Sequence, residues 1–305
     1  MKAIRNWMQP FRQSKQKWIP TVRNKKVPKW VLGLLFLAPS LLGVAVFVLV
    51  PFADVVRRSF LDAMGKEFAG ISNYESVFQN EAFQLAAGNT IKFILICIPL
   101  LLLVSLVCAL LINGLKGYQE FFKTTFLFPM AIPVASVVLL WRLFLDRNGF
   151  FNEGVRLFGL SPVDWMNSEK AFGVLVFTYL WKNVGYDMIL WLAGLAAIPK
   201  ERYEAASVDG AGRWQTFRYV TLPGLRSSVF VIGILSLVNC FKVFREAYLI
   251  AGDYPHESIY MMQHLFNNWF VSLDIQKMTA ASVVMAIVML VIMSLVWYRN
   301  ERSQE

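Results

Sequence analysis

The chain has 305 residues, of which 57% are hydrophobic and only 16% charged, and its formal net charge is +10. A soluble domain carries about a quarter charged residues, so this composition excludes an ordinary soluble fold and indicates a membrane protein. A mean hydropathy of +0.50 agrees with that assignment.

Long apolar runs follow one another along the chain, each close to the ~20 residues that a helix needs to cross a hydrocarbon core about 30 Å thick. The pattern predicts an all-α, multi-pass membrane protein. Its transmembrane domain covers residues 30–298, between a basic segment at 1–29 and a short tail at 299–305. The six predicted spans are residues 30–51, 90–112, 124–145, 171–197, 227–250 and 278–298.

Positive charge predicts the orientation of these spans. Alternate segments, beginning with 1–29, hold 18 Lys and Arg residues, whereas the segments between them hold 7. Because positive loops stay in the cytoplasm, we expect both termini and residues 198–226 to be cytoplasmic. The first apolar run is too long for a cleaved secretory signal. The basic leader suits anionic lipid headgroups, and no folded scaffold supports nucleic-acid binding.

Several prolines and all three cysteines lie inside the predicted spans. Pro99, Pro129 and Pro133 disturb their helices, as happens around transport cavities and also in ordinary bundles. The cysteines at 97, 108 and 240 lack metal-ligand spacing, so we interpret them as packing residues and expect neither a metal nor a cofactor.

The fourth and fifth spans carry polar and charged side chains. An isolated charge at the centre of a membrane helix costs at least ~2.5–3.5 kcal/mol, so such residues suggest function. Sugars need hydrogen-bonding groups for their hydroxyls and aromatic faces for their rings, and both are present. The candidate substrate pathway is Asn183, Tyr186, Asp187, Trp191, Asn239, Lys242, Arg245 and Glu246. Two alternatives stay open, namely a structural pair between Lys182 and Asp187, and snorkelling of Arg245 and Glu246.

The segment between these spans predicts a short helix, a turn and a second helix. Pro199 suits the first turn of a helix over residues 200–208, and Gly210 suits a stop with positive φ. We expect the second helix to cover residues 211–220 and to end before Leu222-Pro223. Such an element is either a docking element, with Ala205 and Ala206 allowing close approach of a partner, or a connector lying on the membrane surface.

This segment resembles the EAA loop of binding-protein-dependent ABC importer permeases. The matching residues are Glu204-Ala205-Ala206, Gly210, Val220 in place of the usual isoleucine, and Leu222-Pro223. Its surroundings are similar to the carbohydrate branch, whose larger permease subunits serve maltose- and glycerol-phosphate-type transporters. Further likeness lies in Asn73-Tyr74, Asn89-Thr90, Phe128-Pro129, Trp141, Gly149 and Asn152, whereas Gly252-Asp253-Tyr254-Pro255 departs from the usual Gly-Gly-Pro.

The resemblance implies the type I (MetI-like) importer fold and a permease that moves a carbohydrate, either a di- or an oligosaccharide, through a bacterial cytoplasmic membrane by alternating access. The implied partners are a second, different permease, two ATP-binding cassette ATPases and an extracytoplasmic sugar-binding protein. The loop would be the coupling helix, with Glu204 meeting the ATPase. The implied coupling residues are Glu204, Ala205, Ala206, Gly210, Leu222 and Pro223.

Two other classes compete with this reading. A secondary transporter driven by an ion gradient could use Asp187 and Glu246, but the chain shows no internal repeat. An intramembrane enzyme has little support, because His256 and His264 are the only histidines and lack metal-ligand company. The sequence also lacks a G-x-x-x-x-G-K-[ST] phosphate loop, so we expect ATP hydrolysis to occur in a separate subunit.

Overall fold

The computed structural model describes residues 29–115, 117–243, 247–248 and 254–302. Among these residues the ordered structure is helical, apart from one isolated antiparallel bridge between Leu61 and Phe68. The chain divides into two compact units, Met1–Asp54 and Val55–Glu305. The elements are α1 (Lys29–Val44), η2 (Ala45–Leu49), α2 (Val50–Arg58), α3 (Ser72–Gln79), α4 (Glu81–Asn113), α5 (Gln119–Ala131), α6 (Val134–Leu145), α7 (Phe150–Leu157), α8 (Ala171–Ala196), α9 (Lys200–Val208), α10 (Arg213–Thr216), η3 (Phe217–Thr221), α11 (Leu222–Gly224), α12 (Arg226–Cys240), η4 (Phe241–Val243), η5 (Glu257–Ile259), α14 (Met262–Val271) and α15 (Ile275–Glu301).

The described part of the first unit is helical. Helix α1 runs through the π-helical turn η2 into α2, and this stretch is long and apolar enough to cross a membrane. Large apolar side chains such as Leu35, Phe36 and Phe47 are exposed along it. A helix that is apolar all round belongs in lipid or against another apolar surface, which agrees with the predicted first span.

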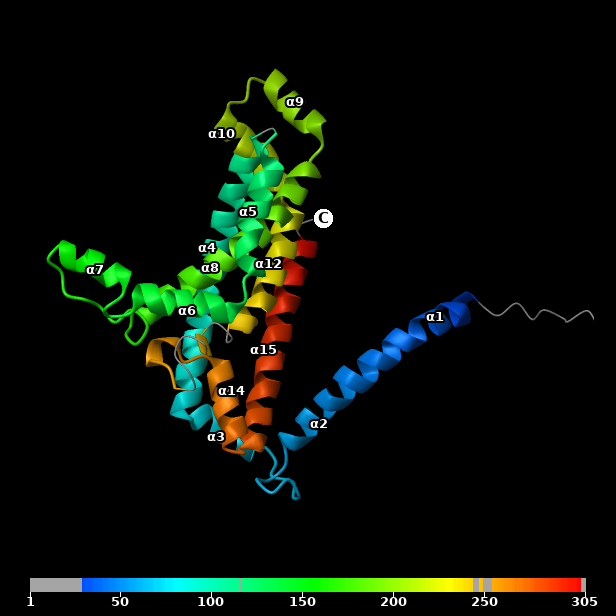
Figure 1. Cartoon of the computed structure of the whole chain (residues 1–305). Coiled ribbons are helices and arrows are strands. Elements are labelled where there is room, and N and C mark those ends of the chain that lie inside the picture. Colours follow the sequence, from blue (N-terminus) through cyan, green and yellow to red (C-terminus); the bar gives the residue numbers. More distant parts are fainter. Residues whose placement is uncertain (1–28, 116, 244–246, 249–253, 303–305) are drawn as a thin grey trace, which may run out of the picture. The chain divides into compact units, whose positions relative to one another are not determined.

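The second unit is built around two long helices, α4 and α8, which pack along each other. Helix α5 packs on α8, and α12 contacts α4, α8 and α15, as Figure 1 shows. Gly185 makes the α5–α8 contact possible, since a Cβ atom there would lie 1.9 Å from the carbonyl oxygen of Phe126. Small residues allow membrane helices this close approach.

Within the residues that the structure describes, three helical stretches meet the length and hydropathy expected of a membrane span, or up to five if each of two bent helix pairs counts as one span. The predicted number of six therefore stays a prediction. Helix α8 falls outside this count although it has 26 residues, because Lys182, Asn183 and Asp187 make it more polar.

The predicted third span, 124–145, is broken at Pro133, one of the prolines expected to disturb its helix. Helix α5 ends at Ala131, α6 begins at Val134, and the two directions differ by 87°. Pro133 causes the break, because it has no N–H to donate and forces Ile132 into an extended conformation with ψ 129°.

The predicted fifth span, 227–250, is not one continuous α-helix, although Ala247 and Tyr248 near its end are helical again. Helix α12 ends at Cys240 and a single 3-10 turn, η4, follows. The side-chain amide of Gln263 in α14 donates a hydrogen bond to the carbonyl oxygen of Phe241. This tertiary bond satisfies a carbonyl that a continuing helix would have used.

Three asparagines among the residues that resemble the family hold loops in place through hydrogen bonds of their side chains. Asn73 donates to the carbonyl oxygens of Ser59 and Leu61, and Asn89 donates to those of Glu257 and Tyr260. Fully buried Asn152 bonds both backbone groups of Val163, at 2.8 and 3.0 Å. In these loops the side-chain amides satisfy backbone groups that have no partner in a helix or sheet.

An Asp-centred turn closes the loop between Leu61 and Phe68. The Asp62 carboxylate accepts the backbone N–H groups of Lys66 and Glu67, at 2.7 and 3.1 Å. These donors hold the pKa of the Asp62 carboxyl below its usual range.

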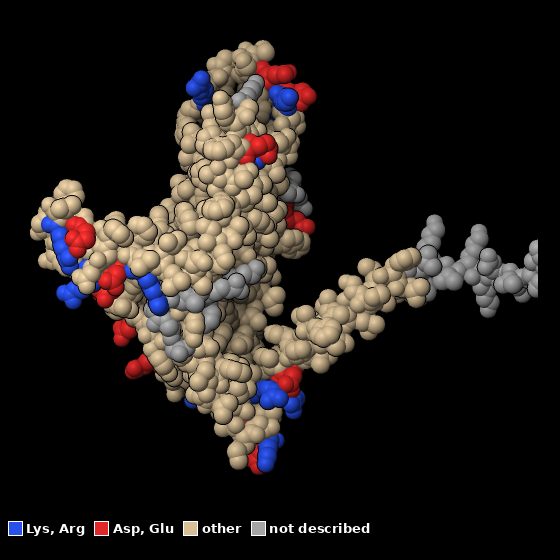
Figure 2. Space-filling model, in the orientation of Figure 1, with Lys and Arg blue, Asp and Glu red and all other residues tan. Residues whose placement is uncertain are grey.

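Figure 2 shows that charged side chains on the visible face gather at the loop around α9, around α7 and near the loops at the opposite end of the bundle. Most of the surface along the long helices between them is uncharged. This distribution suits a protein whose middle faces hydrocarbon.

Candidate functional site

The loop over residues 198–226 begins with a helix that matches the prediction residue for residue. Helix α9 covers Lys200–Val208, and Gly210 has a φ of +73°. The N–H of Ala211 donates to the oxygen of Ala206 at 2.9 Å, and that of Gly210 donates to the oxygen of Ser207 at 3.1 Å. These two bonds form a Schellman motif, in which the residue at the Gly210 position needs positive φ.

The second half of the loop differs from the prediction. Helical structure starts at Arg213, where the Gly212 N–H donates to the side-chain oxygen of Gln215 at 2.8 Å. It then continues through the π-turn η3 and through Leu222-Pro223 to Gly224, rather than ending near residue 220. Pro223 is tolerated because it lies in the first turn of α11, where the wider π-turn has just shifted the hydrogen-bond register.

Contacts at both ends hold the loop to the bundle. Ile198 and Leu225 are buried in the cluster around α8 and α12, and Tyr203 packs against it. The Tyr203 hydroxyl lies 3.3 Å from the Thr221 hydroxyl and so links α9 to η3. The loop is therefore a shaped element with fixed ends rather than an extended connector.

The outer surface of the loop is available to a partner. Glu204 and Ala205 are exposed, and so are the large apolar side chains Val208, at 87%, and Trp214, at 72%. Ala206 differs from the prediction, because its side chain is buried and not open to a partner. A carboxylate beside exposed apolar side chains at a rigid tip is typical of a docking surface.

A second group of polar residues belongs to α8 and α12, which pack against each other. We call it the polar centre, and it consists of Lys182, Asn183, Tyr186 and Asp187 on α8 with Ser236 and Asn239 on α12. Asp187 is only 2% exposed, and one of its carboxylate oxygens accepts a hydrogen bond of 2.8 Å from the Ser236 hydroxyl. Sequence reasoning missed Ser236, which a search of the fifth span for hydroxyl residues could have found.

The predicted pathway residues on α8 have different surroundings. Asn183 and Tyr186 are partly exposed, and the Asn183 amide donates to the Tyr179 carbonyl oxygen at 2.8 Å. Trp191 is 2% exposed and donates its indole N–H to Ser105 of α4 at 2.9 Å. In this conformation Trp191 and Asp187 therefore reach almost no accessible surface.

The structure describes only some of the predicted residues at the end of α12 and beyond it. Asn239 is partly exposed near the end of α12, and Lys242 falls in the turn η4. The prediction that Asn239 and Lys242 share a face assumed a continuous α-helix with 3.6 residues per turn. A 3-10 turn begins at Phe241, so that assumption does not hold up to Lys242. Arg245 and Glu246 lie outside the described residues.

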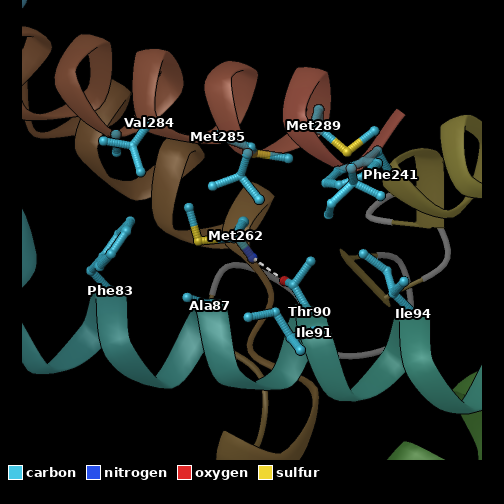
Figure 3. Close-up of a pocket in the computed structure, with 13 residues that line it drawn as sticks. Phe83, Ala87, Thr90, Ile91, Ile94, Phe241, Met262, Val284, Met285 and Met289 are labelled. Atoms are coloured by element: carbon cyan, nitrogen blue, oxygen red, sulfur yellow. Dashed lines mark hydrogen bonds between the residues drawn. The ribbon is translucent and has the colours of Figure 1, made fainter. Parts of the chain in front are cut away.

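An apolar pocket of about 120 Å³ lies between α4, α14 and α15 (Figure 3). Methionine side chains from α14 and α15 face it, and Phe241 lies near Met289 at one end. Its hydroxyl-bearing residue, Thr90, already accepts the Met262 N–H at 3.1 Å. The pocket suits an apolar occupant, and none of its lining residues belongs to the polar centre.

No group of three or more His, Cys, Asp or Glu side chains that could hold a metal ion is found among the described residues. The three cysteines are unpaired, with Cys97 and Cys240 buried.

Comparisons with known proteins point to one family. Residues 101–299 match the family described as "Binding-protein-dependent transport system inner membrane component". The sulfoquinovosyl glycerol transport system permease protein of Agrobacterium fabrum is 30% identical over 281 residues, which cover 87% of this chain and 91% of that protein. The trehalose/maltose transport system permease protein of Thermococcus litoralis is 32% identical over 231 residues, which cover 73% of this chain and 78% of that protein.

A solved structure shares the fold. One chain of a bacterial ABC transporter involved in the import of the acidic polysaccharide alginate matches with a TM-score of 0.80 and 25% identity, covering 91% of this chain and 97% of that chain. A second structure of an alginate ABC transporter, in complex with an alginate pentasaccharide-bound periplasmic protein, matches with a TM-score of 0.78 and 24% identity.

Proposed function

The chain belongs to the family of binding-protein-dependent transport system inner membrane components, as a permease of the sugar-importer branch; from this premise we propose that it moves a di- or oligosaccharide by alternating access. It would form one half of the membrane pathway, with a different permease as the other half. Two ATP-binding cassette ATPases and an extracytoplasmic sugar-binding protein would complete the transporter.

The observation that carries the proposal is the early end of α12 beside the polar centre. Helix α12 has 15 residues and is therefore about 22 Å long, which is too short to cross a core of about 30 Å. Phe241 directly follows it and shares a pocket with Met289, near the middle of α15. A break in an α-helix at this depth is tolerated where protein buries the freed backbone groups or where it lines a water-filled cavity.

The side chains near this point suit a sugar. Asn183, Tyr186 and Asn239 offer amides and an aromatic hydroxyl on partly exposed surfaces. The Ser236–Asp187 bond fixes α12 against α8 and so would position these groups. We propose that Asn183, Tyr186 and Asn239 contact substrate, together with Lys242, whereas Asp187 and Trp191 hold the helices in place.

The 198–226 loop would couple this pathway to ATP hydrolysis. Its rigid tip exposes Glu204, which suits a basic residue of an ATPase, and Val208 and Trp214 would pack on the same partner. We propose that this loop and both termini face the cytoplasm, since their side of the membrane carries most of the Lys and Arg residues. Energy would come from the separate ATPase, since this chain lacks a phosphate-binding loop.

Uptake into vesicles containing the complete transporter tests this function. Vesicles with ATP trapped inside and binding protein outside should accumulate a labelled oligosaccharide, and an ionophore that abolishes ion gradients should not prevent it. A cysteine at Ser207 should react with an impermeant thiol reagent only after the vesicles are opened. Uptake that follows an ion gradient and ignores ATP would instead identify a secondary transporter.

A further inference from the structure

A second, basic pocket lies on the outside of the bundle, where η3, α12 and α15 meet. It is open to the surroundings and has a volume of about 590 Å³. Arg218 of η3, Arg226 at the start of α12 and Arg299 near the end of α15 all line it. None of the described residues that line this pocket is acidic.

The pocket has a charged part and an apolar part, and both follow the same order along the two helices α12 and α15. Along α12, Phe230 follows Arg226 by four residues, so both lie on the same face one turn apart. Along α15, Val296 precedes Arg299 by three residues and also lines the pocket. On both helices the arginine is therefore nearer the helix end and the apolar side chain one turn further into the bundle.

This change from apolar to basic lies at the expected level of the membrane interface. Helix α15 is a candidate span, and α12 belongs to one of the bent pairs. Trp297 and Tyr298, beside Arg299, are 55% and 47% exposed. Exposed Trp and Tyr side chains concentrate where hydrocarbon gives way to headgroups.

We propose that this pocket binds an anionic phospholipid. The three guanidinium groups would hold the headgroup phosphate, because arginine makes paired hydrogen bonds to phosphate oxygens. Val229, Phe230 and Val296 would contact the first part of an acyl chain. Basic pockets between membrane helices on the cytoplasmic side are known to suit such lipids. The assignment to that side rests on the proposed orientation.

Arg218 links this site to transport. It belongs to η3, which is part of the 198–226 loop, whereas Arg226 and Arg299 belong to membrane helices. A lipid phosphate held by all three would tie the root of the loop to the bundle. The bound lipid would thereby help to hold the coupling loop in place.

The test measures lipid binding to the intact transporter. The complete complex is placed in nanodiscs of dioleoylphosphatidylcholine with increasing dioleoylphosphatidylglycerol, and the retained phosphatidylglycerol is counted by native mass spectrometry. Each basic side chain near an anionic surface contributes roughly fivefold in affinity. The double variant Arg218→Gln/Arg299→Gln should therefore retain phosphatidylglycerol at least about tenfold less well. Soluble glycerol phosphate should not compete, since it lacks acyl chains.

The matched control is Lys123→Gln/Arg302→Gln, which removes the same charge from residues outside the pocket. It should keep wild-type retention, and Arg218→Lys/Arg299→Lys should keep most of it. Equal retention by the glutamine variant and the control would overturn the proposal. So would unchanged retention with loss of the ATPase, which would assign the arginines to that partner, or full competition by glycerol phosphate.

If the glutamine variant does not assemble, wild-type transporter decides the question. Phosphatidylglycerol should then raise its melting temperature relative to phosphatidylcholine, and 0.5 M salt should remove the difference. No difference would reject the site. Sugar-stimulated ATP hydrolysis in nanodiscs that contain phosphatidylglycerol, measured in parallel, shows separately whether the proposed transport function holds.

Discussion

The 198–226 loop and the polar centre are formed by different kinds of contact. In the loop, the bonds that set the turn join residues three to five positions apart, such as Ala211 to Ala206 and Gly212 to Gln215. In the polar centre, Ser236 bonds Asp187 across 49 positions. The loop is therefore shaped mainly by its own sequence, whereas the polar centre exists only after the helices have packed.

This difference predicts how each region responds to mutation. A change in the loop should alter its outer surface and leave the bundle folded, because few other elements rest on its tip. A change in the polar centre should affect both helix packing and transport, because the same groups serve both. Measuring stability and transport separately in each variant is the way to test this contrast.

The largest effect is expected from Gly210→Val in the loop. Valine is strongly disfavoured at the φ of +73° that Gly210 adopts, so the Schellman turn should be lost and α9 displaced from the second half of the loop. We expect sugar-stimulated ATP hydrolysis to fall at least about tenfold. A displaced α9 should lose its contacts with the ATPase, and the loss of a central interface contact has an effect of this size. The melting temperature of the permease should change little.

Gly210→Asn is the matched control, since asparagine tolerates positive φ far better than valine does. It should keep stimulated hydrolysis within about threefold of the wild type, as expected for a small residual strain. Normal hydrolysis and normal ATPase co-purification in the valine variant would mean that the turn is not needed for coupling, and the contrast between the two regions would fail.

An intermediate effect is expected from Ser236→Ala in the polar centre. The substitution removes the hydroxyl that bonds buried Asp187, and an unsatisfied buried acceptor costs about 1–3 kcal/mol. Thermal stability and uptake should therefore both fall. Adding Asp187→Leu removes the orphaned carboxylate, so the double variant should regain stability but not uptake. If uptake recovers as well, the pair serves packing alone.

The accuracy of the sequence predictions follows the same division. Helix α9 and the positive φ of Gly210 are confirmed, because Pro199, Asp209 and Gly210 act through local backbone preferences. The continuation through Pro223 was missed, since a π-turn leaves no simple sequence pattern. Local rules therefore predict the first half of the loop better than the second.

The predicted spans differ from the membrane helices because contacts between distant parts of the chain affect where a helix stops. Just after the end of α12, the carbonyl oxygen of Phe241 accepts a hydrogen bond from Gln263, which is 22 positions away. Apolar residues also lie beyond the charged Lys242, Arg245 and Glu246, so the length of the apolar stretch alone predicts a single span. The 87° bend after α5 was signalled by Pro133, although the sequence could not give its size. Composition thus predicts which segments are apolar better than where their helices stop.

The smallest effect is expected from Tyr203→Phe, which tests whether the loop depends on tertiary contacts at all. The hydroxyls of Tyr203 and Thr221 are 3.3 Å apart, a long hydrogen bond between two neutral groups, and the Tyr203 ring keeps its packing against the bundle in the variant. Such a bond contributes about 0.5–1.5 kcal/mol, and here the lower end applies because Tyr203 is only partly buried and water can replace the partner. Stimulated hydrolysis should therefore change by no more than about threefold. Thr221→Val, which removes the other hydroxyl at similar volume, should give the same change, and the double variant should be no worse than either single one. A loss as large as that of Gly210→Val would show that this one tertiary bond sets the position of α9, and the loop would then resemble the polar centre in depending on packing.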